Sequence, residues 1–133
     1  MITPEQLAAP GTEHALQVAL FCWSARQIDR FPDIGLMFAI PNGGERNIIV
    51  ASRMRAEGVK SGVSDICLPV PRHAYHGFFI EMKKPGGKES ETQKAFGKGV
   101  MANGYLYSMF DCWEKAANAL TWYLSNGAEH EHK

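Results

Sequence analysis

Hydrophobic residues recur three and four positions apart over residues 13–28, and this spacing predicts a helix that Thr12 caps. A short apolar run at 36–40 predicts a strand. Residues 46–57 predict a second helix, which ends at Gly58.

The middle of the chain predicts a two-stranded hairpin. Residues 66–70 and 77–83 are rich in apolar and aromatic residues typical of strands, and residues 71–76 form the turn between them. Alternate residues of a strand share a face, so Glu81 and Lys83 should point the same way. Ile80 and Met82 should then point the other way, into a core.

Three further elements complete the chain. Ser90 and Gln93 have the spacing of a capping box, which predicts a helix that ends at Gly104. Residues 105–110 alternate as a strand, and the apolar spacing that follows predicts a last helix that stops near Gly127.

The order of these elements predicts one α/β domain over residues 1–133, with a central mixed sheet flanked by helices. Residues 1–11 contain two prolines and little periodicity, which predicts a loose leader. Residues 128–133 are polar and predict a mobile tail.

Composition narrows the class of protein. Hydrophobic residues make up 45% of the chain and charged residues 21%, which is ordinary for a soluble globular protein. The sequence has no apolar stretch long enough to cross a bilayer and no secretory leader pattern, so the cytosol is the expected compartment. Its three cysteines lie far apart without a C-x-x-C pair, which favours buried thiols over a zinc site.

The net charge is zero, yet the basic residues are not evenly spread. They cluster before Asp65 and after Glu81, which is compatible with a nucleic-acid partner because phosphate binding needs local positive charge. An ordinary solvated face is an equal alternative for the arginines of 46–57. The candidate nucleic-acid-binding residues are Arg46, Arg53, Lys60, Lys84, Lys88, Lys94 and Lys98.

Two acids and a lysine are the strongest candidate site. If the hairpin strands pair antiparallel, Asp65 lies near Glu81, and Lys83 projects from the same strand face as Glu81. Two carboxylates suit a hard cation such as Mg²⁺, which takes oxygen ligands and keeps several waters. The alternative is a surface salt bridge between Glu81 and Lys83 or Lys84, which leaves Asp65 unexplained.

The order of these residues resembles a known family. Gly62-Val63-Ser64-Asp65, then Ile80-Glu81-Met82-Lys83-Lys84-Pro85 and the downstream Gln93, are similar to the virus-type replication-repair nuclease domain, VRR-NUC, of the PD-(D/E)xK nuclease superfamily. The resemblance runs from about Glu13 to Tyr105. One departure is Ser64, which stands where such proteins often carry proline.

The resemblance implies a restriction-endonuclease-like core and a catalytic set of Asp65, Glu81, Lys83, Glu13 and Gln93. Mg²⁺ or Mn²⁺ would be held by both central acids and the Met82 carbonyl, with Glu13 of the first helix holding an outer water or a second ion. Without the resemblance, the position of Glu13 favours a first-turn acid stabilised by the helix dipole over a site residue, and Gln93 is fully explained as a helix cap.

The expected function is a metal-dependent, structure-specific DNA endonuclease in a bacterial or phage-infected cell. By resemblance it would be similar to Holliday junction resolvases and act on branched DNA as a homodimer. A chain of 133 residues has no separate DNA-reading domain, which favours recognition of shape over sequence. The alternatives are a general or restriction-like endonuclease with the same site and a non-catalytic DNA-binding or scaffold protein.

Overall fold

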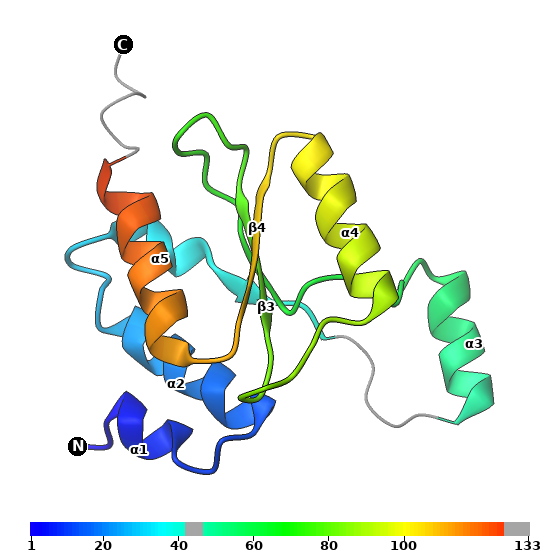
Figure 1. The fold of residues 1–133 in the computed structure, drawn as a ribbon, viewed down its shortest axis with the longest axis horizontal. Coiled ribbons are helices and arrows are strands. Elements are labelled where there is room, and N and C mark those ends of the chain that lie inside the picture. The colour runs from blue at the N-terminus through cyan, green and yellow to red at the C-terminus, as the bar shows by residue number, and fades with distance from the viewer. Residues whose placement is uncertain (42–46, 127–133) are drawn as a thin grey trace.

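The structure is a computed structural model that describes residues 1–41 and 47–126. Helices and strands alternate around one sheet (Figure 1). The elements in chain order are α1 (Pro4–Ala8), α2 (Glu13–Ala25), the 3-10 helix η1 (Pro32–Leu36), β1 (Phe38–Ala39), α3 (Ile48–Ala56), β2 (Ile66–Leu68), β3 (Phe78–Met82), α4 (Glu91–Ala102), β4 (Leu106–Phe110) and α5 (Trp113–Asn126).

The sheet has four strands in the order β1-β2-β3-β4. β1 and β3 both pair antiparallel with β2, which confirms the predicted hairpin, and β4 lies parallel to β3 after the α4 crossover. In the hairpin Ile66 lies opposite Ile80. This register brings the residues directly before β2 beside the end of β3, and the sheet is mixed, as predicted.

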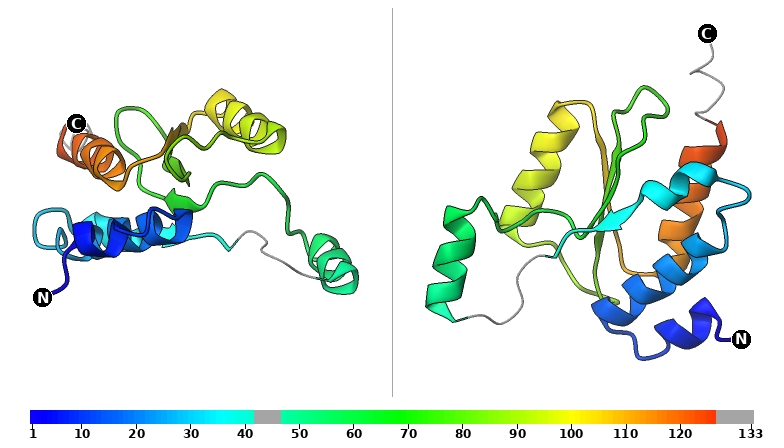
Figure 2. Two further views of the ribbon diagram at one scale, coloured as in Figure 1. Left: turned by 60° about the horizontal axis from the view of Figure 1, so that its bottom comes forward. Right: turned by 180° about the vertical axis from the view of Figure 1, so that it is seen from behind.

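Helices cover the two faces of the sheet unequally. α2 and α5 lie on one face and α4 on the other, while α3 stands apart beyond α4 (Figure 2). Alternation along β3 follows this division: Ile80 and Met82 are fully buried in the core, whereas Phe79 faces the α4 side. There the Phe79 and Phe96 rings meet edge to face, with 5.2 Å between centroids.

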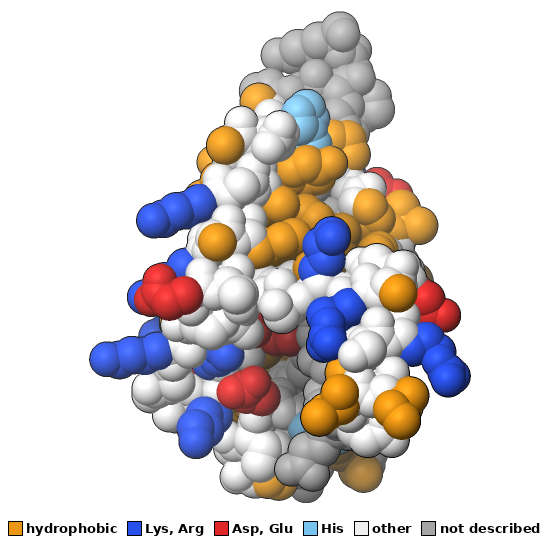
Figure 3. Space-filling view, turned by 90° about the vertical axis from the view of Figure 1, so that its right-hand side faces the viewer, with side chains coloured by type: hydrophobic (Ala, Val, Ile, Leu, Met, Phe, Trp, Pro, Cys, Tyr) orange, Lys and Arg blue, Asp and Glu red, His pale blue; other side chains and the backbone are white. Residues whose placement is uncertain are grey.

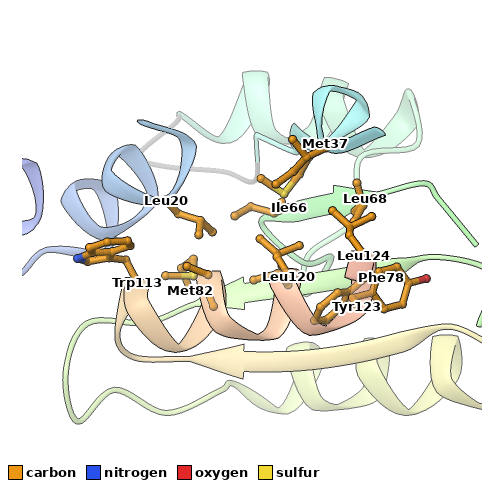
Figure 4. Close-up of a cluster of buried hydrophobic side chains, with 14 of the residues drawn as sticks. Leu20, Met37, Ile66, Leu68, Phe78, Met82, Trp113, Leu120, Tyr123 and Leu124 are labelled. Carbon is orange, nitrogen blue, oxygen red and sulfur yellow. The ribbon is translucent and has the colours of Figure 1, made fainter. Parts of the chain in front are cut away.

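The core lies between the sheet and the α2–α5 layer. Leu20 of α2, Leu120 of α5 and the inward side chains of β2 and β3 converge there (Figure 4). Tyr123 is also fully buried, and its hydroxyl donates a hydrogen bond to the Val70 carbonyl over 2.7 Å. The motif strand β3 is therefore anchored on its apolar face.

The expected loose leader is wrong for part of residues 1–11. Pro4–Ala8 form α1, because Thr3 and Gln6 make a capping box and proline at the first helical position is pre-organised for the helix. Leu7 packs against the core. The tail at 128–133 lies outside the described residues.

Other boundaries differ by a few residues. The first long helix ends at Ala25 rather than near 28, and the strand expected at 36–40 is shortened to Phe38–Ala39. Pro32 begins a 3-10 turn just before it, and the turn buries Ile34. Among the described helices, none is long and apolar enough to span a membrane.

Shortening Leu120 to alanine should lower the free energy of unfolding by about 2–5 kcal/mol, because a fully buried leucine leaves a cavity. The exposed Asn118 of the same helix offers a matched control, and its change to alanine should alter stability by less than about 0.5 kcal/mol. Urea unfolding measures both. Equal effects of the two substitutions would contradict the described core.

Candidate active site

The backbone brings Asp65 and Glu81 together. Asp65 directly precedes β2 and Glu81 lies in β3, so the Ile66–Ile80 register sets these two acids opposite each other. Asp65 Oδ2 accepts a hydrogen bond from the Met82 amide over 2.9 Å. That bond fixes the Asp65 carboxylate against the backbone of the residue that follows Glu81.

Gly62 shapes the loop that leads to Asp65. Its φ of +88° is in the left-handed region, and a Cβ atom built there would lie 2.5 Å from the Thr92 carbonyl oxygen at the start of α4. Only glycine permits both the backbone conformation and this contact. The glycine of the G-x-x-D motif therefore seats the loop against α4.

Lys83 projects from the same strand face as Glu81. Its Nζ lies 4.0 Å from Glu81 Oε2, and its side chain is only 13% exposed. The Lys83 amide donates to the Phe110 carbonyl over 2.9 Å, so β4 holds the backbone at this position. A largely buried ammonium group thus accompanies the acid pair.

Gln93 joins the helix cap to the acid pair. Its Oε1 accepts from the Ser90 amide over 2.8 Å, while its Nε2 donates to Glu81 Oε2 over 3.0 Å. The Ser90 hydroxyl completes the capping box at the Gln93 amide. The Gln93 side chain therefore caps α4 with its oxygen and contacts Glu81 with its nitrogen.

The electrostatics of Glu81 are unusual. The residue is 1% exposed, and burial first, then the neighbouring Asp65 carboxylate, raise its pKa from 4.5 to about 8. Lys83 opposes the shift and Glu13 adds to it. Glu81 Oε1 is buried without a hydrogen-bond partner among the described residues. When both acids are ionised, their two negative charges exceed the one positive charge of Lys83.

A divalent cation fits this arrangement. It would neutralise the repulsion between Asp65 and Glu81 and give Glu81 Oε1 a partner. The described residues contain no group of three or more His, Cys, Asp or Glu side chains placed to hold a metal. Glu13 is therefore not a third direct ligand in this conformation, but Mg²⁺ needs only one or two carboxylates when it keeps its waters.

The acids lie in a cleft of about 550 Å³. Glu13, Glu81 and Gln93 all line it, so the first helix does contribute its acid to the same space. On the face that carries α3 and α4, lysine and arginine side chains lie on either side of a hollow containing acidic side chains (Figure 3). The cleft is thus acidic inside and basic at its margins.

The candidate nucleic-acid-binding residues occupy different places. Lys60 lines the cleft, whereas the remaining described ones are exposed and do not line it: Arg53, Lys84, Lys88, Lys94 and Lys98. Lys94 forms a surface ion pair with Glu91 over 3.6 Å, which competes with a phosphate contact. Arg46 lies outside the described residues.

Several residues of the site were missed by the sequence reasoning. Arg55 and Met54 of α3 line the cleft, as do Ser90 and Thr92 at the start of α4. The capping motif was a signal for Ser90 and its neighbours. Arg55 belongs to the basic cluster before Asp65, but nothing in the sequence shows which side of the helix faces Asp65. Met54 had no signal in the sequence.

A contact between Tyr107 and Glu89 links β4 to the segment just before α4. The Tyr107 hydroxyl on β4 donates a short hydrogen bond to Glu89, the residue before Ser90. Burial and then the Glu89 carboxylate raise the pKa of Tyr107, so the phenol stays protonated as a donor. Its ring also lies against Gly97, where a Cβ would come within 2.7 Å. These contacts fix α4 relative to the sheet.

Sheet, flanking helices and paired acids together define an α/β domain with a nuclease-like core. Among solved structures, one described as "VRR_NUC domain protein" is similar to this chain with a TM-score of 0.76 and 26% identity. The similarity covers 87% of this chain and 90% of that chain. It supports a VRR-NUC domain, as the motif order indicated, and with it a nuclease domain. No family model matches the sequence, and no curated protein matches it at a significant level.

The raised pKa of Glu81 predicts how stability depends on pH without metal. Between about pH 4.5 and 8 the folded protein keeps a proton that the unfolded chain has released, so raising the pH through this window should lower the free energy of unfolding. Glu81→Gln should remove this decline, since glutamine does not titrate. Urea unfolding in EDTA from pH 5 to pH 8.5 measures it. Parallel pH profiles of the two proteins would exclude the shift.

Proposed function

We propose that this protein is a metal-dependent, structure-specific DNA endonuclease that hydrolyses phosphodiester bonds and acts as a homodimer on branched DNA. One observation carries the proposal: Glu81 is buried with Oε1 unpartnered among the described residues, beside Asp65 and within 4.0 Å of a lysine. A surface salt bridge of Glu81 with Lys83 or Lys84 does not explain a carboxyl group buried this deeply beside a second acid. The "VRR_NUC domain protein" neighbour supports the nuclease class.

Asp65, Glu81 and the Met82 carbonyl are the groups that would hold Mg²⁺ or Mn²⁺. The Met82 backbone already lies against Asp65 through its amide, which supports including its carbonyl. When bound, such an ion lowers the pKa of a coordinated water and polarises a phosphate oxygen. Glu13, which lines the same cleft, would hold an outer water or a second ion.

Lys83 and Gln93 supply the remaining chemistry. The Lys83 ammonium, held close to Glu81, would orient the attacking water and offset negative charge in the transition state. Gln93 donates to Glu81 Oε2 and so fixes that carboxylate, leaving the other oxygen for a ligand. The helix cap holds the Gln93 side chain in place, because the Ser90 amide donates a hydrogen bond to Gln93 Oε1.

DNA is the proposed substrate because cations surround the cleft. Lys60 lines it, and the exposed residues Arg53, Lys84, Lys88, Lys94 and Lys98 could contact phosphates beyond it. Recognition would rest on backbone shape, since a single small domain offers few contacts to base edges. A general or restriction-like endonuclease with the same acids is the nearer alternative, and a DNA-binding scaffold the more distant one.

Cleavage of labelled DNA with and without divalent metal tests the activity. Wild type should release product in Mg²⁺ or Mn²⁺ and none in EDTA, while Asp65→Asn and Glu81→Gln should each slow cleavage at least about a hundredfold. Asp29→Asn is a matched isosteric control, because Asp29 is exposed and does not line the cleft. Undiminished cleavage by the Asp65 or Glu81 variant, purified in the same way, would refute the assignment.

Paired cutting of a four-way junction requires two sites in one particle. Light scattering at micromolar concentrations should therefore give the mass of a dimer, and the dimer should cut junctions faster than linear duplex of the same sequence. A monomer at every concentration would remove the basis for paired cutting. Equal rates on both substrates would favour the general endonuclease.

A further inference from the structure

Apolar side chains line the wall of the cleft that is formed by α3 and the loop after it. No residue of α3 is buried, and the helix stands apart from the sheet and its covering helices (Figure 1). Even so, Met54, Val59 and Val63 line the cleft opposite the start of α4. Helices normally use apolar side chains to pack on a core, and among the described residues α3 buries none of its own.

Cations accompany this apolar wall. Arg55 and Lys60 line the same cleft, and both are exposed. Arg55 is steadied by a hydrogen bond of 3.1 Å from its guanidinium to Ser52 Oγ. The wall therefore offers an apolar surface next to two positive groups, which complements a nucleotide with its flat base and its phosphate.

The size of the cleft limits what can enter. Its volume of about 550 Å³ is in the range of small-molecule pockets, which is about 300–1,000 Å³. Glu81 lines it with only 1% of its surface exposed. A double helix, whose major groove alone is about 12 Å wide, is too large to enter such a space. One nucleotide outside the base stack fits it.

We infer that Met54, Val59 and Val63, with Arg55 and Lys60, form a subsite for one unpaired nucleotide adjoining the phosphate that is cut. The base lies against the thioether of Met54 and the two valines, and the flanking phosphates contact Arg55 and Lys60. This inference rests on the proposed nuclease function and names its substrate class: DNA with unpaired nucleotides at the cut site, as at flaps, gaps and open junctions. Unpaired bases enter at lower cost because no stacking or pairing is broken.

Binding of DNA in EDTA tests the subsite independently of cleavage. The probes are a single-stranded oligonucleotide containing 2-aminopurine and a duplex of the same length. Wild type should bind the single strand more tightly than the duplex and change the fluorescence of the base. Met54→Ala should weaken single-strand binding about two- to tenfold, the range expected for a sulfur–aromatic contact.

Ile49→Ala is the matched control. Ile49 lies on the same helix, is 71% exposed and does not line the cleft, so its loss should leave binding unchanged. Both variants should fold, because α3 buries none of its residues and alanine favours helix. Binding by Met54→Ala equal to that of Ile49→Ala, or tighter binding of duplex than of single strand by wild type, would overturn the subsite.

Cleavage in Mg²⁺ separates this inference from the function on which it rests. Wild type should cut a duplex with a central unpaired bubble faster than the continuous duplex, and Met54→Ala should reduce that preference. If wild type cuts DNA and Met54→Ala shows the same preference for the bubble, the subsite is refuted and the proposed nuclease function stands. If wild type cuts no substrate but binds single strands, and Met54→Ala weakens that binding, the nuclease function is refuted and the nucleotide site stands.

Discussion

The candidate site depends on the antiparallel register of β2 and β3. That register sets Asp65 against Glu81, and burial of the second acid makes the closeness of two negative groups costly. Apolar packing of Ile80 and Met82 on the other face of β3 holds the strand in place despite this cost. A one-residue slip would exchange the two faces of the strand and place Glu81 in the core. The core therefore holds the two acids together, and a cation between them would allow both to ionise.

The helix α4 is the second constraint. Its first turn meets Gly62 of the loop before Asp65 and reaches Glu81 through Gln93, so one helix end touches both strands that bear the acids. Tyr107 holds the same helix against β4 through Glu89 and Gly97. Strand and helix positions are thus coupled, and the packing of these elements, not an attraction between the two carboxyl groups, sets the geometry of the acids.

The sequence was informative wherever a residue's role was set by local physics. Period-two alternation placed Glu81 and Lys83 on one face, and the capping-box spacing located the start of α4. Long-range contacts were not predictable: no local rule shows that Gly62 meets Thr92, or that Met54 and Arg55 of an unburied helix line the cleft. The short helix α1 was missed because two prolines outweighed the cap at Thr3. The family resemblance supplied Glu13, because its position in the sequence alone favours a first-turn acid.

The central claim is that Asp65 and Glu81 hold one divalent cation between them. Its most direct test is an anomalous difference map from a crystal grown with Mn²⁺. The account predicts a peak within about 2.0–2.3 Å of both carboxylates, with the Met82 carbonyl beside it. Saturating Mn²⁺ without any peak between these two side chains, in a crystal where the fold is intact, would contradict it.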